Sequence, residues 1–425
     1  MQVKLAYGHK GLWVDIPDSV HPTIIEPLFT PGLADERAAI RSALAAPTGS
    51  APLADLVTKE DTVAVVFSDI TRPMPNDRVL PVLLQALAEA GVRDEAVTLI
   101  NGLASHRQQT GEELARMLGE DVARRYRILQ HDAWDDASLA PVALNHAGRM
   151  VRINRAYLEA SVRILTGFIE PHFFAGFSGG PKAVLPGIAD IEAIMDNHNA
   201  TMIGSPQSTW AVTHGNPIWE EMHAIAAATR PTFLLNVTLN KHKQITGVFA
   251  GDLDAAHAAG TEFLRQKAMQ AVAEPFDVVI TSNSGYPLDL NLYQSVKGMS
   301  AAAQIVCPGG DIIIAAECWD GIPAHGQYAR LLRQAESLEA VHQAILAPGF
   351  RSADQWQVQI QAQIQKKARV HVYAGGLSDE ELTAAKVLPC RSIERTLAGI
   401  LERNPQASVA ILPEGPQTVP YLEKI

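Results

Sequence analysis

The order of apolar and polar positions predicts alternating strands and helices in the first part of the chain. Runs rich in Val, Ile, Leu and Phe are typical of buried strands and fall at 62–67, 96–100 and 162–166. Apolar residues at helical spacing follow these runs, over 77–90, 111–118 and 191–197. Continuous apolar strands that alternate with helices predict a doubly wound, mostly parallel sheet.

The same alternation resumes after a helical segment predicted at 251–272, which ends near Glu274 and Pro275. Strands are expected at 277–281, 311–315, 370–373 and 408–412. Helices are expected at 292–306 and 392–402. We therefore predict two α/β domains, 1–270 and 275–425, with mostly parallel, Rossmann-like sheets and an interdomain active-site cleft. A packing of the last dozen residues on the first domain is the alternative.

Composition narrows the class of protein. The chain has 425 residues, of which 47% are hydrophobic and 19% charged, and this is ordinary for a soluble enzyme with more than one core. A net charge of −11 argues against nucleic acid as a partner. The three cysteines form no CxxC motif, so neither a disulfide framework nor a structural zinc site is expected, and a reducing cytoplasm fits. No signal layout or membrane-spanning apolar run is found, so no membrane partner is expected.

Polar residues follow the first two predicted strands, where open α/β sheets bind ligands. Asp69 and Arg72 come after the strand at 62–67, and an arginine fork suits a carboxylate or phosphate. A local pair between these two side chains is the structural alternative. His106 follows the strand at 96–100 and is a candidate general base, although loop histidines are more often solvated or capping residues.

A glycine-rich stretch follows the third strand. Gly179 and Gly180 offer backbone N–H groups to an anion, and Lys182 adds a positive charge or a nucleophilic amine. The stretch fits neither the Walker A nor the GxGxxG pattern. His172, in the same stretch, is either a buried hydrogen-bonded ring or a reactive one. His198 lies near the end of a predicted helix and is either a protonated ring favoured by the helix dipole or a neutral metal ligand.

In the second predicted domain, Gln294 and Lys297 share one helix face and could bind a carboxylate. A solvated helix face is the usual explanation of such a pair. Tyr293 precedes them, and Trp356 belongs to a polar and aromatic cluster further along the chain.

Taken together, these motifs resemble those of the nickel-dependent lactate racemase family. They occur in the same order as in that family and at similar spacing. The longest is GFIEPHFFAGFSGGPK at 167–182, and the others are DITRP at 69–73, SHR at 105–107, NH at 197–198, YQSVK at 293–297 and DQW at 354–356. The resemblance implies a racemase or epimerase of a 2-hydroxy acid.

The resemblance also implies a cofactor, the nickel-pincer nucleotide, in which nickel is held by a pyridinium-3,5-bisthiocarboxylic acid mononucleotide. Lys182 would be its covalent tether and His198 its protein ligand to nickel. Asp69 and Arg72 would hold cofactor and substrate. Other proteins build this cofactor, so transient contacts with them are expected.

For the reaction, the family implies that His106 and His172 act as the two bases. One takes the hydroxyl proton while hydride moves to the cofactor, and the planar 2-keto acid then receives the hydride on its other face. Hydride transfer avoids removing a poorly acidic α-hydrogen as a proton, and the cofactor supplies the redox chemistry.

Substrate binding is assigned by the resemblance to further residues. Arg72 and Lys297 would hold the carboxylate, with Tyr293, Gln294 and Trp356 beside it. Pro181 stands where the family often has arginine, which leaves the substrate open among lactate, malate, aromatic 2-hydroxy acids and sugar acids.

Three rival functions remain. An NAD-dependent 2-hydroxyacid dehydrogenase would share the chemistry, but the GxGxxG turn is absent where it would be needed. A zinc hydrolase or lyase could use the three histidines, and a non-enzymatic nucleotide-binding protein would bind ligand without changing its stereochemistry.

Overall fold

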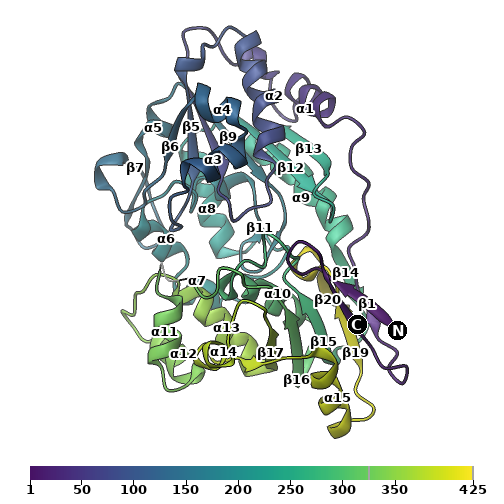
Figure 1. The fold of residues 1–425 in the computed structure, drawn as a ribbon. Coiled ribbons are helices and arrows are strands. Elements are labelled where there is room, and N and C mark those ends of the chain that lie inside the picture. The colour runs from purple at the N-terminus through teal and green to yellow at the C-terminus, as the bar shows by residue number, and fades with distance from the viewer. Residues whose placement is uncertain (324–325, 424–425) are drawn as a thin grey trace. The chain divides into compact units, whose positions relative to one another are not determined.

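Two parallel-rich sheets organise the computed structural model, which describes residues 1–323 and 326–423 (Figure 1). The chain divides into two compact units. The N-terminal unit comprises Phe29–His198 and Pro206–Gln266, and the C-terminal unit comprises Met1–Leu28, Asn199–Ser205 and Lys267–Ile425. The division follows space rather than chain order, because the first 28 residues and a short segment after His198 belong with the C-terminal half.

The sheet of the N-terminal unit has the order β13-β12-β9-β4-β5-β6. Its strands are β4 (Val63–Ser68), β5 (Val97–Gly102), β6 (Arg127–Gln130), β9 (Val162–Phe168), β12 (Phe233–Leu239) and β13 (Ile245–Gly251). All neighbours are parallel except β12 and β13. The helices are α1 (Glu36–Ala45), α2 (Asn76–Glu89), α3 (Gly111–Leu118), α4 (Glu120–Arg125), α5 (Arg155–Glu159), α6 (Ile191–Asn197), α8 (Pro217–Ala228) and α9 (Leu253–Ala268).

Strand β4 fixes the core of this unit. Five of its six residues are buried, so its apolar run packs on both faces, as the sequence pattern predicts. Leu80, Leu83 and Leu87 of α2 lie in the same apolar cluster as β4. The chain builds the sheet outward from β4 to β6, then returns to add β9 and β12 on the other side. The carboxyl ends of β4 and β9 therefore mark the point where the direction of winding reverses.

The N-terminal unit also contains two antiparallel hairpins. One pairs β7 (Leu139–Leu144) with β8 (Met150–Asn154). The other pairs β10 (Pro171–His172) with β11 (Gly176–Phe177), directly after β9.

The C-terminal unit has a second sheet, ordered β18-β17-β16-β15-β19-β3 and parallel throughout. Its strands are β3 (Thr23–Ile24), β15 (Phe276–Ser282), β16 (Val306–Ala315), β17 (Arg369–Tyr373), β18 (Leu388–Pro389) and β19 (Val409–Leu412). The helices are α7 (Ala200–Gly204), α10 (Leu292–Ala303), α11 (Tyr328–Gln334), α12 (Leu338–Leu346), α13 (Gln355–Lys367), α14 (Asp379–Ala384) and α15 (Ile393–Arg403). The β1 (Gln2–Leu5) and β2 (Leu12–Asp15) hairpin belongs to this unit as well.

The α/β class and the parallel sheets confirm the sequence prediction, whereas two predicted helices are too long. The segment predicted as a helix over 251–272 ends at Ala268, and Met269–Val272 forms strand β14. This strand pairs in parallel with β20 (Val419–Leu422), near the end of the chain, so a distant backbone partner overrides the local helical pattern. The helix predicted over 292–306 likewise ends at Ala303, because Val306 pairs with Phe276 and begins β16.

No helix in residues 1–323 and 326–423 combines the length and apolar character required to cross a membrane.

Two helix glycines give a matched test of close packing in the C-terminal unit. A β-carbon on Gly298 in α10 would overlap the Ser282 carbonyl oxygen at the end of β15, whereas one on Gly399 in α15 would meet open space. We expect Gly298→Ala to destabilise the fold by about 1–3 kcal/mol through overpacking. Gly399→Ala should stabilise it by about 0.5–1 kcal/mol through helix propensity. Urea unfolding measures both, and equal effects would contradict the close approach of α10 to β15.

Candidate active site

A pocket in the N-terminal unit opens at the carboxyl ends of β4, β5 and β9, where a doubly wound sheet binds its ligand. Its space is about 600 Å³, including the part open to solvent. Four of the residues singled out in the sequence for their charged or titratable side chains line it: Asp69, Arg72, His106 and Lys182. Small residues such as Gly102, Gly167 and Gly179 complete the lining and leave backbone accessible to a ligand.

Asp69 and His106 form a carboxylate–imidazole pair in this pocket. The His106 Nδ1 atom lies 2.6 Å from Asp69 Oδ2, and the Thr71 hydroxyl donates to Asp69 Oδ1 at 2.8 Å. Burial by itself raises the pKa of Asp69, but His106, Arg72 and Thr71 together lower it below its ordinary value. An ionised carboxylate only accepts hydrogen bonds, so His106 Nδ1 carries a proton, and in the neutral ring Nε2 is then the acceptor. This is the form a general base requires.

Arg72 brings a positive charge to the same pocket. Its Nη1 atom lies 3.6 Å from Glu170 Oε1, which is an ion pair but too long for a hydrogen bond. Within the described residues, this buried Nη1 has no hydrogen-bond acceptor. A partly buried guanidinium with unused donor capacity at Nη1 is suited to an incoming carboxylate or phosphate.

The glycine-rich loop that carries Lys182 packs tightly on two buried side chains. Gly179 and Gly180 both have positive φ, and the Gly180 N–H donates to Asn236 Oδ1 at 2.8 Å. A β-carbon on Gly179 would overlap Asn236, and one on Gly180 would overlap His257. The loop therefore requires glycine at both positions, and it then enters a short 3₁₀ turn over Gly180–Ala183 that holds Lys182.

Aromatic contacts bring Lys182 together with His172 and His198. The ring of Phe174 lies 4.5 Å from that of His172 and 5.1 Å from that of His198, edge to face in both cases. The Lys182 Nζ atom lies 5.7 Å from the centre of the same Phe174 ring. Phe174 is buried and contacts three candidate functional residues.

His198 is held as a neutral ring. Burial, assisted by the charge of Lys182, lowers its pKa to about 3. Its Nδ1 atom lies 3.1 Å from the Ile194 carbonyl oxygen, which only accepts, so Nδ1 carries the proton and Nε2 keeps its lone pair. Of the two interpretations left open by the sequence, the neutral ring fits the structure and the protonated ring does not.

The candidate residues of the C-terminal unit lie on α10 and α13. Asn291 caps α10 by accepting from the Gln294 N–H at 3.0 Å. Gln294 and Lys297 are buried, so the solvated helix face considered from the sequence is wrong. The Gln294 side-chain oxygen has no hydrogen-bond partner among the residues that the structure describes. On α13, the Trp356 indole N–H donates to the Tyr293 hydroxyl at 2.9 Å.

Sequence reasoning missed three side chains that support these groups. Asn236 and His257 lie outside the motifs quoted from the sequence, and Glu170 lies inside the motif at 167–182 but was given no role there. Asp69 was assigned to ligand binding, yet its direct partner is His106. A carboxylate and a histidine that both follow strands of one parallel sheet were the available signal for that pair.

Known proteins match this fold along most of the chain. Residues 7–211 match the lactate racemase N-terminal domain, and residues 271–419 match the lactate racemase C-terminal domain. Lactate racemase of Thermoanaerobacterium thermosaccharolyticum is 34% identical over 420 residues, covering 97% of each chain. Lactate racemase of Lactiplantibacillus plantarum is 36% identical over 383 residues, covering 89% of this chain and 90% of the relative.

Solved structures agree with these matches. The lactate racemase apoprotein from Thermoanaerobacterium thermosaccharolyticum superimposes with a TM-score of 0.92 at 32% identity, covering 100% of both chains. A protein from Thermotoga maritima shares the fold alone, with a TM-score of 0.69 at 18% identity over 93% of this chain and 100% of that one. The fold and these matches define the chain as an isomerase, a racemase. It belongs to the lactate racemase family.

The Asp69–His106 pair predicts a specific dependence of stability on pH. Because its partners lower the pKa of Asp69 below the ordinary 3.8, the pair stabilises the fold above that pH and loses its effect as the pH falls through the folded value. We expect Asp69→Asn to cost about 1–3 kcal/mol near neutral pH and progressively less in acid. Urea unfolding from about pH 7 to about pH 3 measures this difference.

The control repeats Asp69→Asn in a His106→Ala background. Without the imidazole, the strongest influence that lowers the pKa of Asp69 is gone, so the pH-dependent difference should shrink. A difference that keeps its size in both backgrounds would show that the pair does not stabilise the ionised carboxylate.

Proposed function

We propose that this racemase interconverts the two enantiomers of lactate or a closely related 2-hydroxycarboxylate. The observation that carries the proposal is the grouping of a carboxylate-bound histidine, His106, with Lys182 around one pocket, while the buried neutral His198 lies near that lysine. The relatives bear the name lactate racemase, which makes lactate the first substrate to test.

The residues around Lys182 fit a tethered nickel-pincer nucleotide. A neutral, buried imidazole is a good ligand for nickel. In the described parts of the chain, His, Cys, Asp and Glu side chains nowhere gather in a group of three or more that could hold a metal. A metal bound to His198 would therefore need its other donors from a cofactor, which a sulfur-armed pincer on Lys182 provides.

The remaining contacts to the cofactor are assigned to the pocket. Arg72 would bind an anionic group of the nucleotide or the substrate with its unused donors, and Gly179 and Gly180 would leave backbone exposed to it. Asp69 would act mainly through His106. The chemistry that such a cofactor supplies is reversible acceptance of hydride from the carbon that bears the hydroxyl group.

The protein itself would move the hydroxyl proton. The contact of His106 Nδ1 with Asp69 supports a role for Nε2 of the neutral ring as the acceptor. The His172 Nδ1 atom accepts a hydrogen bond from the Ala175 N–H at 3.3 Å, so a neutral His172 carries its proton on Nε2. In this proposal His106 begins neutral and accepts the hydroxyl proton, while His172 begins as the imidazolium and returns a proton from Nε2 to the carbonyl oxygen. The two rings exchange these roles for the opposite enantiomer.

We assign the substrate carboxylate to Arg72. Lys297 and Gln294 are proposed as further substrate-binding residues. Tyr293 and Trp356, which are hydrogen-bonded to each other, would flank the substrate. In this proposal the N-terminal unit supplies the cofactor site and both bases, and the C-terminal unit supplies substrate contacts.

The proton-transfer roles can be tested by chiral analysis of lactate, with protein co-produced with the enzymes that build the cofactor. We expect His106→Ala and His172→Ala each to lower racemisation by at least about 100-fold, whereas His223→Gln, a histidine paired with Asp254 outside the pocket, keeps it. Product formed in D₂O should retain its original hydrogen on carbon 2. Solvent deuterium at that carbon would show direct proton removal and overturn the hydride proposal.

The cofactor roles can be tested by intact mass and nickel analysis. Protein co-produced in this way should gain mass at Lys182 and bind about one nickel per chain. Lys182→Arg should lose both the added mass and the nickel, whereas His198→Ala should keep the added mass and lose nickel. An unmodified Lys182 in active wild-type protein would contradict the tether.

A further inference from the structure

The C-terminal end of α6 carries three successive buried polar residues, Asp196, Asn197 and the C-cap residue His198. Polar side chains in the interior are unfavourable unless they find hydrogen-bond partners. His198 finds one inside its own helix, the Ile194 carbonyl. The partners of the other two come from outside α6.

Asp196 is held by the turn that joins β7 to β8. Its Oδ2 atom accepts from Asn145 Nδ2 at 2.7 Å and from Arg149 Nε at 2.8 Å. The Asn145 side-chain oxygen also accepts from the backbone N–H groups of Ala147 and Arg149, at 3.0 and 2.9 Å. The turn is therefore held by its own hydrogen bonds as well as by those to the Asp196 carboxylate.

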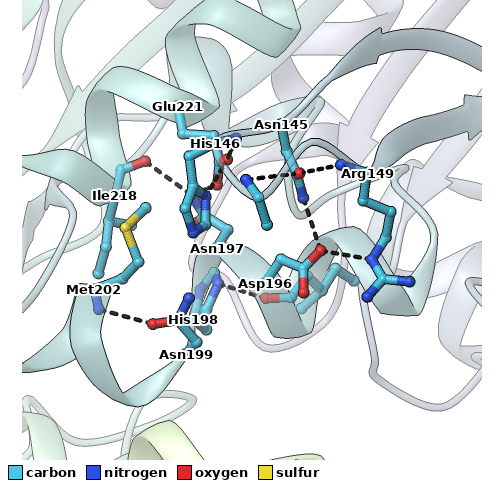
Figure 2. Close-up of polar contacts among 12 residues, drawn as sticks. Asn145, His146, Arg149, Asp196, Asn197, His198, Asn199, Met202, Ile218 and Glu221 are labelled. Atoms are coloured by element: carbon cyan, nitrogen blue, oxygen red, sulfur yellow. Dashed lines mark hydrogen bonds and ion pairs between the residues drawn. The ribbon is translucent and has the colours of Figure 1, made fainter. Parts of the chain in front are cut away.

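Asn197 is held by α8 and, through α8, by the same turn. Its Nδ2 atom donates to Glu221 Oε2 at 2.7 Å and to the Ile218 carbonyl at 3.1 Å. The other oxygen of Glu221 lies 2.6 Å from His146 Nδ1 and accepts the His146 N–H at 2.9 Å. The contacts of Asp196 form one branch of this network, and the contacts of Asn197 and Glu221 form the other. Figure 2 shows the two branches at the end of α6.

The two branches have the same arrangement of charged groups. Each buried carboxylate, Asp196 and Glu221, receives one basic side chain from the turn at 145–149, Arg149 and His146 respectively. The carboxylates are buried, but Arg149 and His146 are about half-exposed, and ion pairs with exposed partners contribute little net stability. The geometry is thus better suited to fixing position than to stabilising the fold.

We propose that Asn145, His146, Arg149 and Glu221 form a clamp that orients His198 toward the metal. The His198 ring is tied to the helix by its own bond to Ile194, so the direction of Nε2 follows the orientation of the helix end. The clamp fixes that end through the two residues immediately before His198. The inference rests on the proposed role of His198 as a nickel ligand, and the clamp residues are positioning residues.

The test uses one variant in each branch. Glu221→Gln keeps the shape of the side chain and removes the charge, and Arg149→Gln removes the cation from a half-exposed position where folding should tolerate the change. Arg149→Lys restores the charge. Glu220→Gln is the matched control, because this neighbouring glutamate on α8 is exposed and accepts only from the Gly215 N–H among the contacts described.

The first measurement needs no cofactor. Hydrogen–deuterium exchange of the apoprotein should speed up in peptides that cover 190–198 in Glu221→Gln and Arg149→Gln, and stay at the wild-type rate in Glu220→Gln. Unchanged exchange in both clamp variants would overturn the clamp, because the helix end would then be fixed by other contacts.

The second measurement is the rate at which a chelator removes nickel from protein co-produced with the cofactor-making enzymes. Support around a metal ligand typically changes metal affinity about 10–100-fold, so both clamp variants should release nickel faster by a factor in that range. Arg149→Lys should recover part of the difference. A purely structural role predicts lower stability in urea with nickel release unchanged, and that result would overturn the proposal.

The His198→Ala variant distinguishes the assignment of His198 as a nickel ligand from the role of the clamp. Wild-type protein that binds nickel, together with a His198→Ala variant that retains nickel as firmly, would overturn both the ligand assignment and the clamp. Loss of nickel in His198→Ala but wild-type retention in both clamp variants would overturn the clamp alone.

Discussion

The reversal of winding direction at β4 is the constraint on which the N-terminal unit depends. Parallel strands all end at one edge of a sheet, and at the reversal the adjacent connections go to opposite faces, so their loops separate and leave a pocket. The loop after β4 supplies Asp69, the loop after β5 supplies His106, and the glycine loop follows β9. Residues that are 37 apart in sequence, Asp69 and His106, are thereby brought within 2.6 Å.

Burial of ionisable groups then sets the chemistry. Asp69 stays ionised because His106, Arg72 and Thr71 outweigh its burial, and it fixes the proton of His106 on the nitrogen that faces it. For His198, burial and the nearby charge of Lys182 lower the pKa to about 3, so the ring is neutral. Two histidines of one unit are thus held in different surroundings, His106 against a buried carboxylate and His198 as a buried neutral ring.

Much of the fold follows from local pattern. The buried strand β4 and the amphipathic helix α3 fall within a residue of their predicted positions, because continuous apolar runs and 3.6-residue spacing are properties of the sequence itself. The pattern failed at Met269–Val272, where pairing with β20 replaces the last turn of a helix. It also gave no sign that β3 joins the C-terminal sheet, since a pair of exposed residues has no periodicity.

The sequence by itself determined the α/β class, the positions of its main strands and the identity of the candidate residues, because side-chain type, spacing and family motifs are written along the chain. Tertiary structure alone decided which groups face one another. It paired Asp69 with His106, put Phe174 between His172 and His198, and placed Glu221 against Asn197. Those pairings depend on which loops the sheet brings to one edge and on how burial changes protonation, and neither is a local property of the chain.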